Sequence, residues 1–249
     1  MPQIIASFEN LINSLAPKVE NFFFIQVGAN DGKSGDPLYH HIVERDWSGV
    51  LIEPQKWVFE QQLLPRYQNF DRLSLENVAI ADADGVRDLY KISFSDRRWA
   101  TGLASLRREQ FMGSKIRSYM ERCVGDERAK LPLQPEDCFT SEQVRTMTFD
   151  TLLDKYRPLK LSLLQIDAEG YDCELLRQYC FDRLAPAVIQ FEHQMASSDE
   201  LEKTLSLLRN RGYQMFRDGI NTVAILCEVA RKLDIVLPGS WVTPIIISG

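Results

Sequence analysis

A glycine-rich loop follows the first strongly apolar stretch of the chain and carries residue types suited to holding a small ligand. The loop reads Val27-Gly28-Ala29-Asn30-Asp31-Gly32-Lys33-Ser34-Gly35-Asp36. Glycine lets the backbone turn sharply and approach a ligand, because no Cβ intervenes. In an open parallel sheet, the turn after the first strand is the usual cradle for a nucleotide. We therefore predict cofactor contacts from Gly28, Ala29, Asn30, Asp31 and Gly32.

The spacing within this loop distinguishes three kinds of nucleotide ligand. A phosphate-binding loop has four residues between its glycines, whereas Gly28 and Gly32 have three between them, and Asp31 would repel a polyphosphate. The dinucleotide pattern requires glycine where this chain has Asn30. S-Adenosylmethionine carries a cationic sulfonium and an α-amino group, so an acidic residue attracts it. The loop therefore fits S-adenosylmethionine best of the three.

Two later apolar stretches carry residues that extend this predicted site. Glu53 ends the second predicted strand, 22 residues after Asp31, where an acidic side chain grips the ribose diol of an adenosyl ligand, NAD included. Asn77 and Ala79 lie near the end of the third predicted strand. Because the carboxyl ends of parallel strands share one edge, we expect Asn77 to contact the adenine amine and Ala79 to leave room for the ring.

Acidic side chains follow the fourth and fifth predicted strands. Asp167 and Glu169 come after residues 161–166, and Glu192 follows residues 187–191. We expect Asp167 to contact both the cofactor and the acceptor, and Glu169 and Glu192 to contact the substrate. Capping of the local backbone is the alternative for Asp167 and Glu169. Carboxylates suit a divalent ion, but no compact ligand spacing is present, so no metal site is predicted.

His193 is the predicted general base. Methyl transfer to an alcohol requires removal of a proton near the methyl group, and an imidazole titrates near neutral pH. A period of two puts His193 on the side of Phe191, and Glu192 on the opposite side. Asp167 would orient the imidazole or contact the acceptor hydroxyl. A histidine held by structural hydrogen bonds at a strand end is the alternative.

Alternating strands and helices must position these residues. Strands are predicted at 22–27, 49–52, 73–81, 161–166 and 187–191, and helices at 37–45, 56–67, 173–179 and 199–209. Residues 213–216 and 222–227 form a predicted antiparallel hairpin at the C-terminal end of the series. This alternation predicts a three-layer, Rossmann-like α/β fold with a mostly parallel sheet covered on both faces.

Residues 95–146 interrupt the alternation and carry a local positive charge. From Arg97 to Lys130, nine basic residues stand against four acidic ones, although the whole chain has a net charge of −6. We predict an insertion that acts as a lid over the active site, with Trp99 and Arg107 contacting the substrate. Its arginines suit an anionic substrate or an acidic carrier protein, and a solvated helical face is the alternative.

The composition limits the class of protein and its partners. A chain of 249 residues suits a single domain over 1–249, and a predicted helix over 1–17 carries an apolar stripe that either covers the domain or forms a homodimer contact. An excess of acidic residues, 35 against 29 basic ones, excludes a general nucleic-acid binder. Five scattered cysteines without a C-x-x-C pair indicate reduced thiols in the cytoplasm, and no apolar stretch is long enough to span a membrane.

Three motifs together resemble the FkbM family of S-adenosylmethionine-dependent methyltransferases. They are Val-Gly-Ala-Asn-Asp-Gly at 27–32, Glu53-Pro54, and Ile166-Asp167-Ala168-Glu169-Gly170-Tyr171-Asp172, and the similarity covers about residues 22–192. The resemblance implies a seven-stranded class I methyltransferase fold. It also implies O-methylation of a small or carrier-bound metabolite, such as a sugar, polyketide or peptide natural product. An N-methyltransferase, an NAD-dependent oxidoreductase and a non-catalytic nucleotide-binding module are the alternatives.

Overall fold

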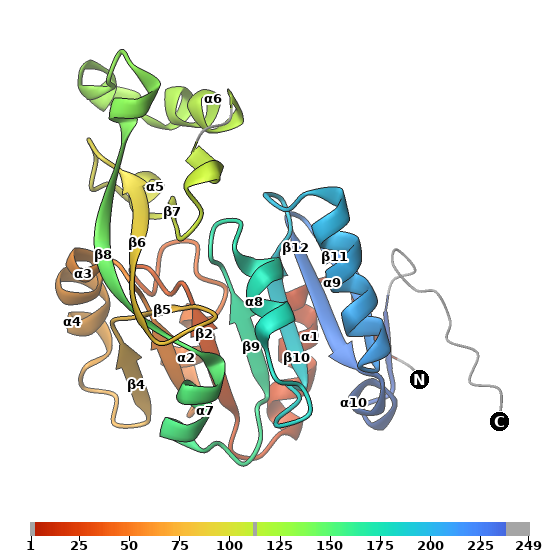
Figure 1. The fold of residues 1–249 in the computed structure, drawn as a ribbon. Helices are drawn as coiled ribbons and strands as arrows, with labels where there is room; N and C mark the ends of the chain where they lie inside the picture. Colours follow the sequence, from red (N-terminus) through yellow and green to blue (C-terminus); the bar gives the residue numbers. More distant parts are fainter. Residues whose placement is uncertain (1–2, 112–113, 238–249) are drawn as a thin grey trace.

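A seven-stranded sheet forms the centre of the computed structural model, which describes residues 3–111 and 114–237 (Figure 1). Its strands lie in the order β11-β12-β10-β9-β2-β3-β4. Their bounds are β2 Phe23–Val27, β3 Ser48–Ile52, β4 Leu73–Glu76, β9 Leu163–Ile166, β10 Val188–Glu192, β11 Tyr213–Asp218 and β12 Asn221–Leu226. β12 runs antiparallel to both of its neighbours, whereas the other neighbouring pairs of this sheet are parallel. The sheet confirms the predicted mostly parallel architecture with an antiparallel C-terminal hairpin.

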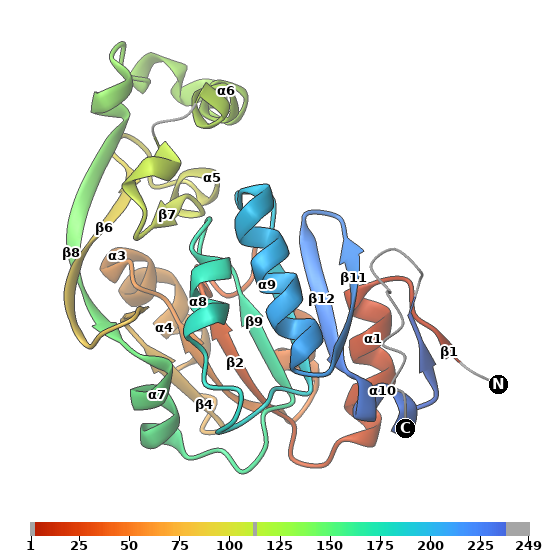
Figure 2. The ribbon, with the colours of Figure 1, turned by 45° about the vertical axis from the view of Figure 1, so that its right-hand side comes forward.

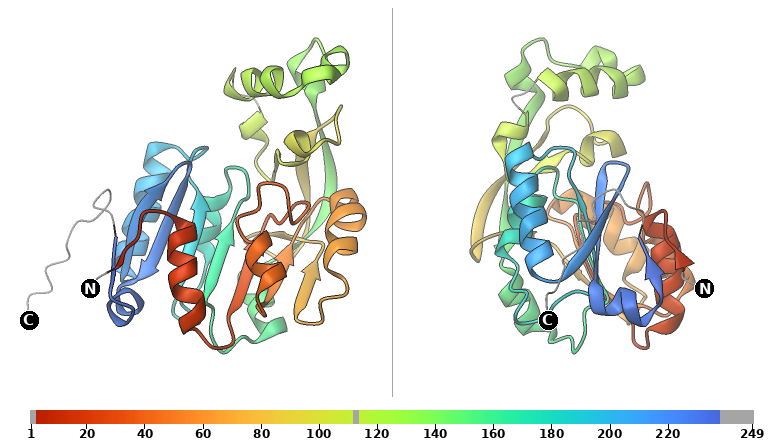
Figure 3. Two further views of the ribbon diagram at one scale, coloured as in Figure 1. Left: turned by 180° about the vertical axis from the view of Figure 1, so that it is seen from behind. Right: turned by 90° about the vertical axis from the view of Figure 1, so that its right-hand side faces the viewer.

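Helices cover both faces of the sheet, because its central strands are apolar on both sides. One face of the sheet, called the α8 face below, packs against three helices: α7 (Phe149–Tyr156), α8 (Asp172–Gln178) and α9 (Ser198–Asn210). The opposite face, called the α2 face below, packs against four helices: α1 (Phe8–Leu15), α2 (Tyr39–Glu44), α4 (Leu64–Tyr67) and α10 (Cys227–Lys232). In the right-hand view of Figure 3, the blue α9 and the red α1 lie on opposite sides of the strands. The three predicted layers are therefore present.

The N-terminal helix is shorter than the predicted 1–17, and residues 1–2 lie outside the described part of the chain. Helix α1 begins after Ser7, whose hydroxyl accepts a hydrogen bond from the backbone N–H of Asn10. β1 (Gln3–Ile4) precedes it and pairs in parallel with β13 (Ile235–Val236), and the short helix η1 (Ala16–Lys18) follows it. The apolar stripe of α1 is buried in the core on the α2 face, so this helix covers the sheet of its own chain.

The predicted strand over 73–81 is divided between two sheets. β4 ends at Glu76, and β5 (Ala79–Ile80) belongs to a second sheet of order β5-β8-β6-β7. Asn77 lies between the two strands and donates its side-chain amide to the backbone oxygens of Glu53 and Pro54. These bonds hold the chain at the end of β3 while it leaves the main sheet.

The predicted helix over 56–67 is continuous, although it contains Pro65. It consists of α3 (Lys56–Val58), the π-helical turn η2 (Phe59–Leu63) and α4. Pro65 lies in the first turn of α4, next to the π turn, where the hydrogen-bond ladder already changes its spacing. Proline therefore does not interrupt this helix.

The second sheet carries an arm, defined here as residues 85–147. β6 (Gly85–Ile92) and β8 (Phe139–Met147) pair antiparallel along their whole length. Between them lie α5 (Arg98–Thr101), β7 (Ala104–Ser105), η3 (Arg108–Phe111), α6 (Ser114–Cys123), η4 (Gly125–Lys130) and η5 (Pro135–Cys138). Figures 1 and 2 show α5 and β7 above the ends of β2 and β9, with α6 farther from the sheet. The insertion therefore begins at β6, before the predicted residue 95, because β8 needs β6 as its partner.

None of the helices in the described part of the chain combines the length and the apolar character that crossing a membrane requires.

Candidate active site

Gly28 and Asp167 bring the ends of two central strands into contact. β2 and β9 are parallel neighbours, with Val27 opposite Ile166, so the loops after them leave the sheet side by side. Gly28 has a φ of +80°, and a Cβ at this position would overlap the backbone oxygen of Asp167. Both the backbone conformation and the lack of space therefore require glycine at position 28.

Asn30 connects this loop to the end of β3 and to the arm. Its φ of 46° lies in the left-handed region, which asparagine tolerates better than most residues. Its backbone N–H donates to Glu53 Oε2 at 2.9 Å, and its side-chain amide donates to the backbone oxygen of Thr101 at 2.7 Å. The Gln55 amide donates to Glu53 Oε1 and to the same Thr101 oxygen. The loop, the end of β3 and α5 thus form one hydrogen-bonded unit.

Glu53 is a buried carboxyl group, with 2% of the residue exposed. Besides the bonds from Asn30 and the Gln55 side chain, it accepts a hydrogen bond from the Gln55 backbone N–H at 2.8 Å. Burial raises the pKa of Glu53 to about 7, although these hydrogen bonds favour the ionised form. Near neutral pH such a group can accept hydrogen bonds from the hydroxyls of a ligand.

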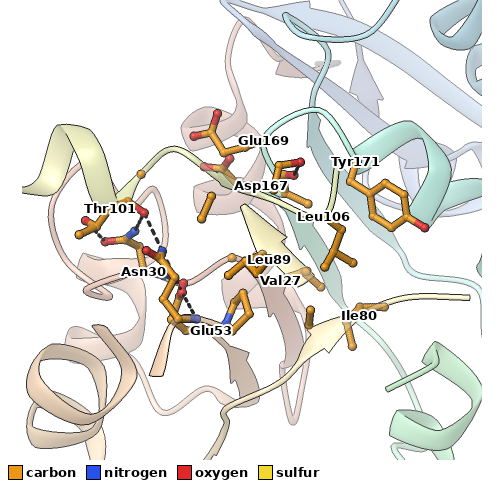
Figure 4. A pocket seen from close by; sticks show the side chains of 18 of the residues that line it. Val27, Asn30, Glu53, Ile80, Leu89, Thr101, Leu106, Asp167, Glu169 and Tyr171 are labelled. Atoms are coloured by element: carbon orange, nitrogen blue, oxygen red, sulfur yellow. Dashed lines mark hydrogen bonds between the residues drawn. The ribbon is translucent and has the colours of Figure 1, made fainter. Parts of the chain in front are cut away.

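Glu53 lines a cavity of about 570 Å³, called the Glu53 cavity below (Figure 4). Glu53, Asn30 and Thr101 form a polar end of this cavity. Apolar side chains line much of the remainder, namely Val27, Val78, Ile80, Leu89, Leu106 and Leu175. Asp167 and Glu169 lie at another side of it. This combination suits a ligand that joins a flat apolar ring to a polar diol.

The turn after β9 holds its carboxylates in a fixed geometry. Glu169 has a φ of 47° and Gly170 a φ of 90°, both in the left-handed region. A non-glycine residue keeps this conformation where its surroundings enforce it. Asp172 holds the turn in this conformation. Its buried carboxylate accepts hydrogen bonds from the backbone N–H groups of Ala168, Gly170 and Glu192 at 3.3, 3.2 and 3.1 Å. Asp172 therefore ties this turn to the end of β10.

A second, wider cavity of about 1480 Å³, called the Gln165 cavity below, adjoins the first. Asp167 and Glu169 line both cavities, so the two meet at these carboxylates. Gln190 and Glu192 also line the Gln165 cavity. The sheet explains this arrangement, because Gln165 lies opposite Gln190 and side chains two residues apart share a face. Asp167 and Glu192 therefore follow the two glutamines on the same side.

The carboxylates at this junction repel one another. Burial raises the pKa of Asp167, and burial together with the charge of Asp167 raises the pKa of Glu192 to about 7. The pKa of Glu169 lies well above its usual range, because of burial first and then of the charge on Asp167. The guanidinium of Arg98, which lines the Glu53 cavity, opposes these shifts at Asp167 and Glu169. The junction therefore disfavours three ionised carboxylates at once, and these groups hold their protons more readily than exposed carboxyls do.

His193, the predicted base, lies outside the linings of both cavities. Its Nδ1 lies 3.1 Å from the Thr222 hydroxyl, and burial lowers its pKa. Glu192, its neighbour in sequence, lines the Gln165 cavity instead. The placement of His193 is therefore corrected: alternation puts the two side chains on opposite sides, and the cavity lies on the side of Glu192.

Two predicted cofactor contacts bind the protein backbone instead. The carboxylate of Asp31 accepts hydrogen bonds from the backbone N–H groups of Lys33 and Ser34 at 2.9 and 2.8 Å, and it does not line the Glu53 cavity. Asn77 uses its amide on the end of β3, as described above, and is also absent from the lining. Both side chains are bonded in this way because short polar side chains beside a tight turn satisfy the backbone N–H and C=O groups nearest to them, and their contacts with a cofactor stay predictions.

The remaining predicted cofactor residues divide into lining and supporting groups. Those that line the Glu53 cavity are Gly28, Asn30, Glu53, Ala79 and Asp167. Ala29 and Gly32 support the loop, since Ala29 N–H donates to the oxygen of Ile52 and the oxygen of Gly32 accepts from the Tyr67 hydroxyl. The structure thus brings most of the predicted residues together at one place.

Of the predicted substrate contacts, the two glutamates line a cavity and the two arm residues do not. Trp99 packs in the apolar cluster of the arm, with its ring 5.8 Å from that of Phe94. Arg107 pairs with Glu200 at 2.7 Å and lies over the ring of Tyr171. Both placements are corrections, because packing and ion pairing within the chain already occupy these side chains.

Among the lining residues that were not predicted from the sequence, four are polar residues at the centre of the two cavities' contacts. Gln55 and Thr101 join Asn30 and Glu53 in the hydrogen-bonded unit, and Gln165 and Gln190 line the second cavity. The glutamines had a signal in the sequence, since each has apolar residues directly on both sides within a buried strand. Thr101 had no such signal, because it accepts the hydrogen bonds from Asn30 and Gln55 through its backbone oxygen, which every residue type has.

The family model of the methyltransferase FkbM domain matches residues 26–215, which is more than half of the chain. Among solved structures, a methyltransferase FkbM from Methylobacillus flagellatus KT aligns with 12% identity over 83% of this chain and 43% of that chain, with a TM-score of 0.46. A ribosomal protein L11 methylase from Lactobacillus delbrueckii subsp. bulgaricus aligns with 9% identity over 86% of this chain and 73% of that chain, with a TM-score of 0.37. The matched part of this chain thus covers less than half of the first of these proteins. No curated protein matches the chain.

Proposed function

Because the chain belongs to the FkbM methyltransferase domain family, we propose that it transfers a methyl group from S-adenosylmethionine to a hydroxyl group of a small or carrier-bound metabolite. The observation that carries this proposal is the meeting of two cavities at Asp167 and Glu169. A donor in one cavity and an acceptor in the other would meet at this junction. In-line methyl transfer requires such a close and fixed approach.

The Glu53 cavity fits S-adenosylmethionine in its chemistry. Gly28 lines this cavity, and its lack of a Cβ lets the backbone of Asp167 lie against it, so the ends of β2 and β9 meet at the cavity wall. Glu53 offers a carboxylate to the ribose hydroxyls, and Ile80 and Leu89 belong to an apolar wall suited to adenine. When bound, S-adenosylmethionine supplies a methyl group on a sulfonium, which is already a good leaving group.

The Gln165 cavity fits a hydroxylated acceptor. Asp167, Glu169 and Glu192 present carboxylate oxygens there, which accept hydrogen bonds from hydroxyl groups. One of them would take the hydroxyl proton as the acceptor oxygen bonds to the methyl carbon and the bond from that carbon to sulfur breaks. Apolar lining from Leu103 and Ile116 suits the hydrocarbon part of an acceptor. This mixed polar and apolar lining supports an acceptor of the sugar, polyketide or peptide natural-product class.

The cysteines support a reducing compartment. All five lie in the described part of the chain as free thiols, and none is bonded to another. Free thiols are the usual state of cysteine in the cytosol. We therefore place the reaction in the cytoplasm.

Calorimetry and label transfer test this function together. Titration with S-adenosylmethionine should show one site per chain, and Glu53→Ala should weaken it at least about tenfold, because a buried hydrogen-bonding partner of the ribose is lost. The exposed change Glu60→Gln serves as control. Radioactivity from methyl-labelled S-adenosylmethionine should then appear in a hydroxylated product from a panel of metabolites. Binding of NAD in place of S-adenosylmethionine would contradict the proposal.

A further inference from the structure

Three carboxylates converge where the two cavities meet. One oxygen from each of Asp167, Glu169 and Glu192 lies within 4.8 Å of the other two. Asp167 and Glu192 reach this point from adjacent strands in register, and Glu169 reaches it through its left-handed turn. Two oxygens on opposite sides of a bound Ca²⁺ are at most about 5 Å apart, and around Mg²⁺ they are about 4 Å apart. The spacing therefore matches the coordination sphere of a divalent cation.

Two glutamines point to a ligand at the same place independently of the acids. Gln165 and Gln190 are 5% and 4% exposed, and both line the Gln165 cavity beside the carboxylates. The amide oxygen of each is buried, and within the described part of the chain it has no hydrogen-bond donor. A buried oxygen without a partner carries a free-energy cost that a cation or its bound water would remove.

Arginines that line the two cavities supply part of the counter-charge for this cluster. The cluster is partly buried, and the nearby positive charge of Arg98 is shared with Asp31, whose carboxylate lies 3.9 Å from its Nε. The positive charges of Arg107 and Lys155 are engaged elsewhere, with Glu200 and Glu76. Arg122 also lines the Gln165 cavity, so among the described residues two arginines, one of them shared with Asp31, line the cavities where the three carboxylates lie.

We propose that Asp167, Glu169 and Glu192 bind one divalent cation of the hard, oxygen-preferring type, such as Mg²⁺, Mn²⁺ or Ca²⁺, with the oxygens of Gln165 and Gln190 facing the ion or its water shell. Oxygen donors without sulfur or imidazole select such ions over zinc or copper. The cation site is inferred from the positions of these side chains and does not depend on the proposed function. Its use, which is to hold the acceptor hydroxyl at the junction, rests on the proposed function.

Binding of Mn²⁺ to the full chain, without cofactor or acceptor, tests the site directly. Electron paramagnetic resonance of free Mn²⁺ and calorimetry should both show one ion per chain. Glu169→Gln and Glu192→Gln should each weaken binding at least about tenfold, and Gln165→Leu about tenfold through its loss of support for the ion. Glu174→Gln is the matched control, because Glu174 is ion-paired with Arg177 on α8 and should bind Mn²⁺ as the unchanged chain does.

The folded state of each variant is checked by its thermal unfolding, with and without Mn²⁺. The unchanged chain should unfold at a higher temperature when Mn²⁺ is present, and Glu192→Gln should lose this shift. Absence of bound Mn²⁺ at millimolar concentration, or binding that none of the three substitutions weakens, overturns the proposal. S-Adenosylmethionine titrated into the same samples separates the two hypotheses, since loss of cofactor binding with Mn²⁺ retained contradicts the proposed function and leaves the cation site standing.

Discussion

Glu53 shows how burial turns an ordinary carboxyl group into one that titrates near neutral pH. Its pKa of about 7 means that the folded chain keeps this proton over a range where the unfolded chain has lost it. The contribution of Glu53 to stability is therefore full below about pH 4.5 and is lost as the pH rises toward 7.

Glu53→Gln should remove this pH dependence. Between pH 4.5 and 8, the unfolding free energy of the unchanged chain should fall more than that of the variant, by on the order of 3 kcal/mol, because one pKa unit corresponds to about 1.4 kcal/mol. Urea unfolding of both proteins at the two pH values measures the difference. Glu60→Gln, at an exposed helix position, should behave as the unchanged chain. Equal pH dependence in Glu53→Gln would show that Glu53 titrates normally.

His193 makes the opposite case, in which a residue suited to catalysis lies outside the linings of both cavities. It is 7% exposed and its ring nitrogen contacts the Thr222 hydroxyl. His193→Ala should lower the unfolding free energy by about 2 kcal/mol, because it empties a buried site and leaves that hydroxyl without a partner. It should leave the affinity for S-adenosylmethionine and the rate of methyl transfer within about threefold. A loss of rate as large as that of Asp167→Asn, with stability unchanged, would restore His193 as the base.

The sequence predicts the residue types of the site better than it predicts which side of the sheet they face. Alternation correctly separates Glu192 from His193, but it cannot say which side holds the cavity. That side is set by where the arm and the loop after β2 lie, and both depend on contacts between distant residues. Glutamines in the buried strands are a partial guide to that side, because Gln165 and Gln190 line the Gln165 cavity, whereas Gln26 in β2 lines neither cavity and donates to Asp36 instead.

At the scale of secondary structure, the close approach of β2 and β9 sets the shape of the cofactor loop. Gly28 is fixed by contact with Asp167, whereas Gly35, in the same loop and also with positive φ, has open space around its Cα. A substitution at Gly35 therefore measures the loss of stability from the backbone conformation alone, whereas one at Gly28 adds the loss from a steric overlap.

Gly28→Ala and Gly35→Ala form a matched pair. Gly35→Ala should cost about 1 kcal/mol, the usual penalty for a side chain in the left-handed region. Gly28→Ala should cost about 3 kcal/mol or more, because the new methyl group forces β2 and β9 apart, and it should abolish binding of S-adenosylmethionine. Denaturant unfolding and calorimetry measure the two effects. Equal losses of stability in both variants would mean that the strand ends can separate without cost.

Most of the predicted strands and helices are present because their signals are local. The apolar runs that form β2, β9 and β10 and the capping box that starts α9 can be read within a few residues. The division of residues 73–81 could not be predicted, because β5 pairs with β8, more than sixty residues away. The arm boundary was misplaced for the same reason, since β6 belongs to the arm through its pairing with β8.

At the scale of the whole molecule, the arm and the central sheet share one cavity. Arg98, Thr101 and Leu106 of the arm line the Glu53 cavity together with residues from the ends of β2, β3 and β9. Hydrogen bonds from Asn30 and Gln55 to the oxygen of Thr101 link the two parts directly. A ligand in this cavity would therefore contact both parts at once, as the predicted role of the arm as a lid requires.

Hydrogen exchange should show this coupling when S-adenosylmethionine binds. Because a ligand that contacts two parts stabilises both against local opening, exchange should slow together in residues 28–32, 53–55 and 98–106. Residues 213–226, in the hairpin at the far edge of the sheet, serve as the internal control and should exchange at unchanged rates. Asn30→Ala should retain the slowing at 53–55 and reduce it at 98–106, because one of the two bonds to Thr101 is lost. Slowing confined to the sheet loops, with none in 98–106 of the unchanged chain, would mean that the arm is not part of the cofactor site.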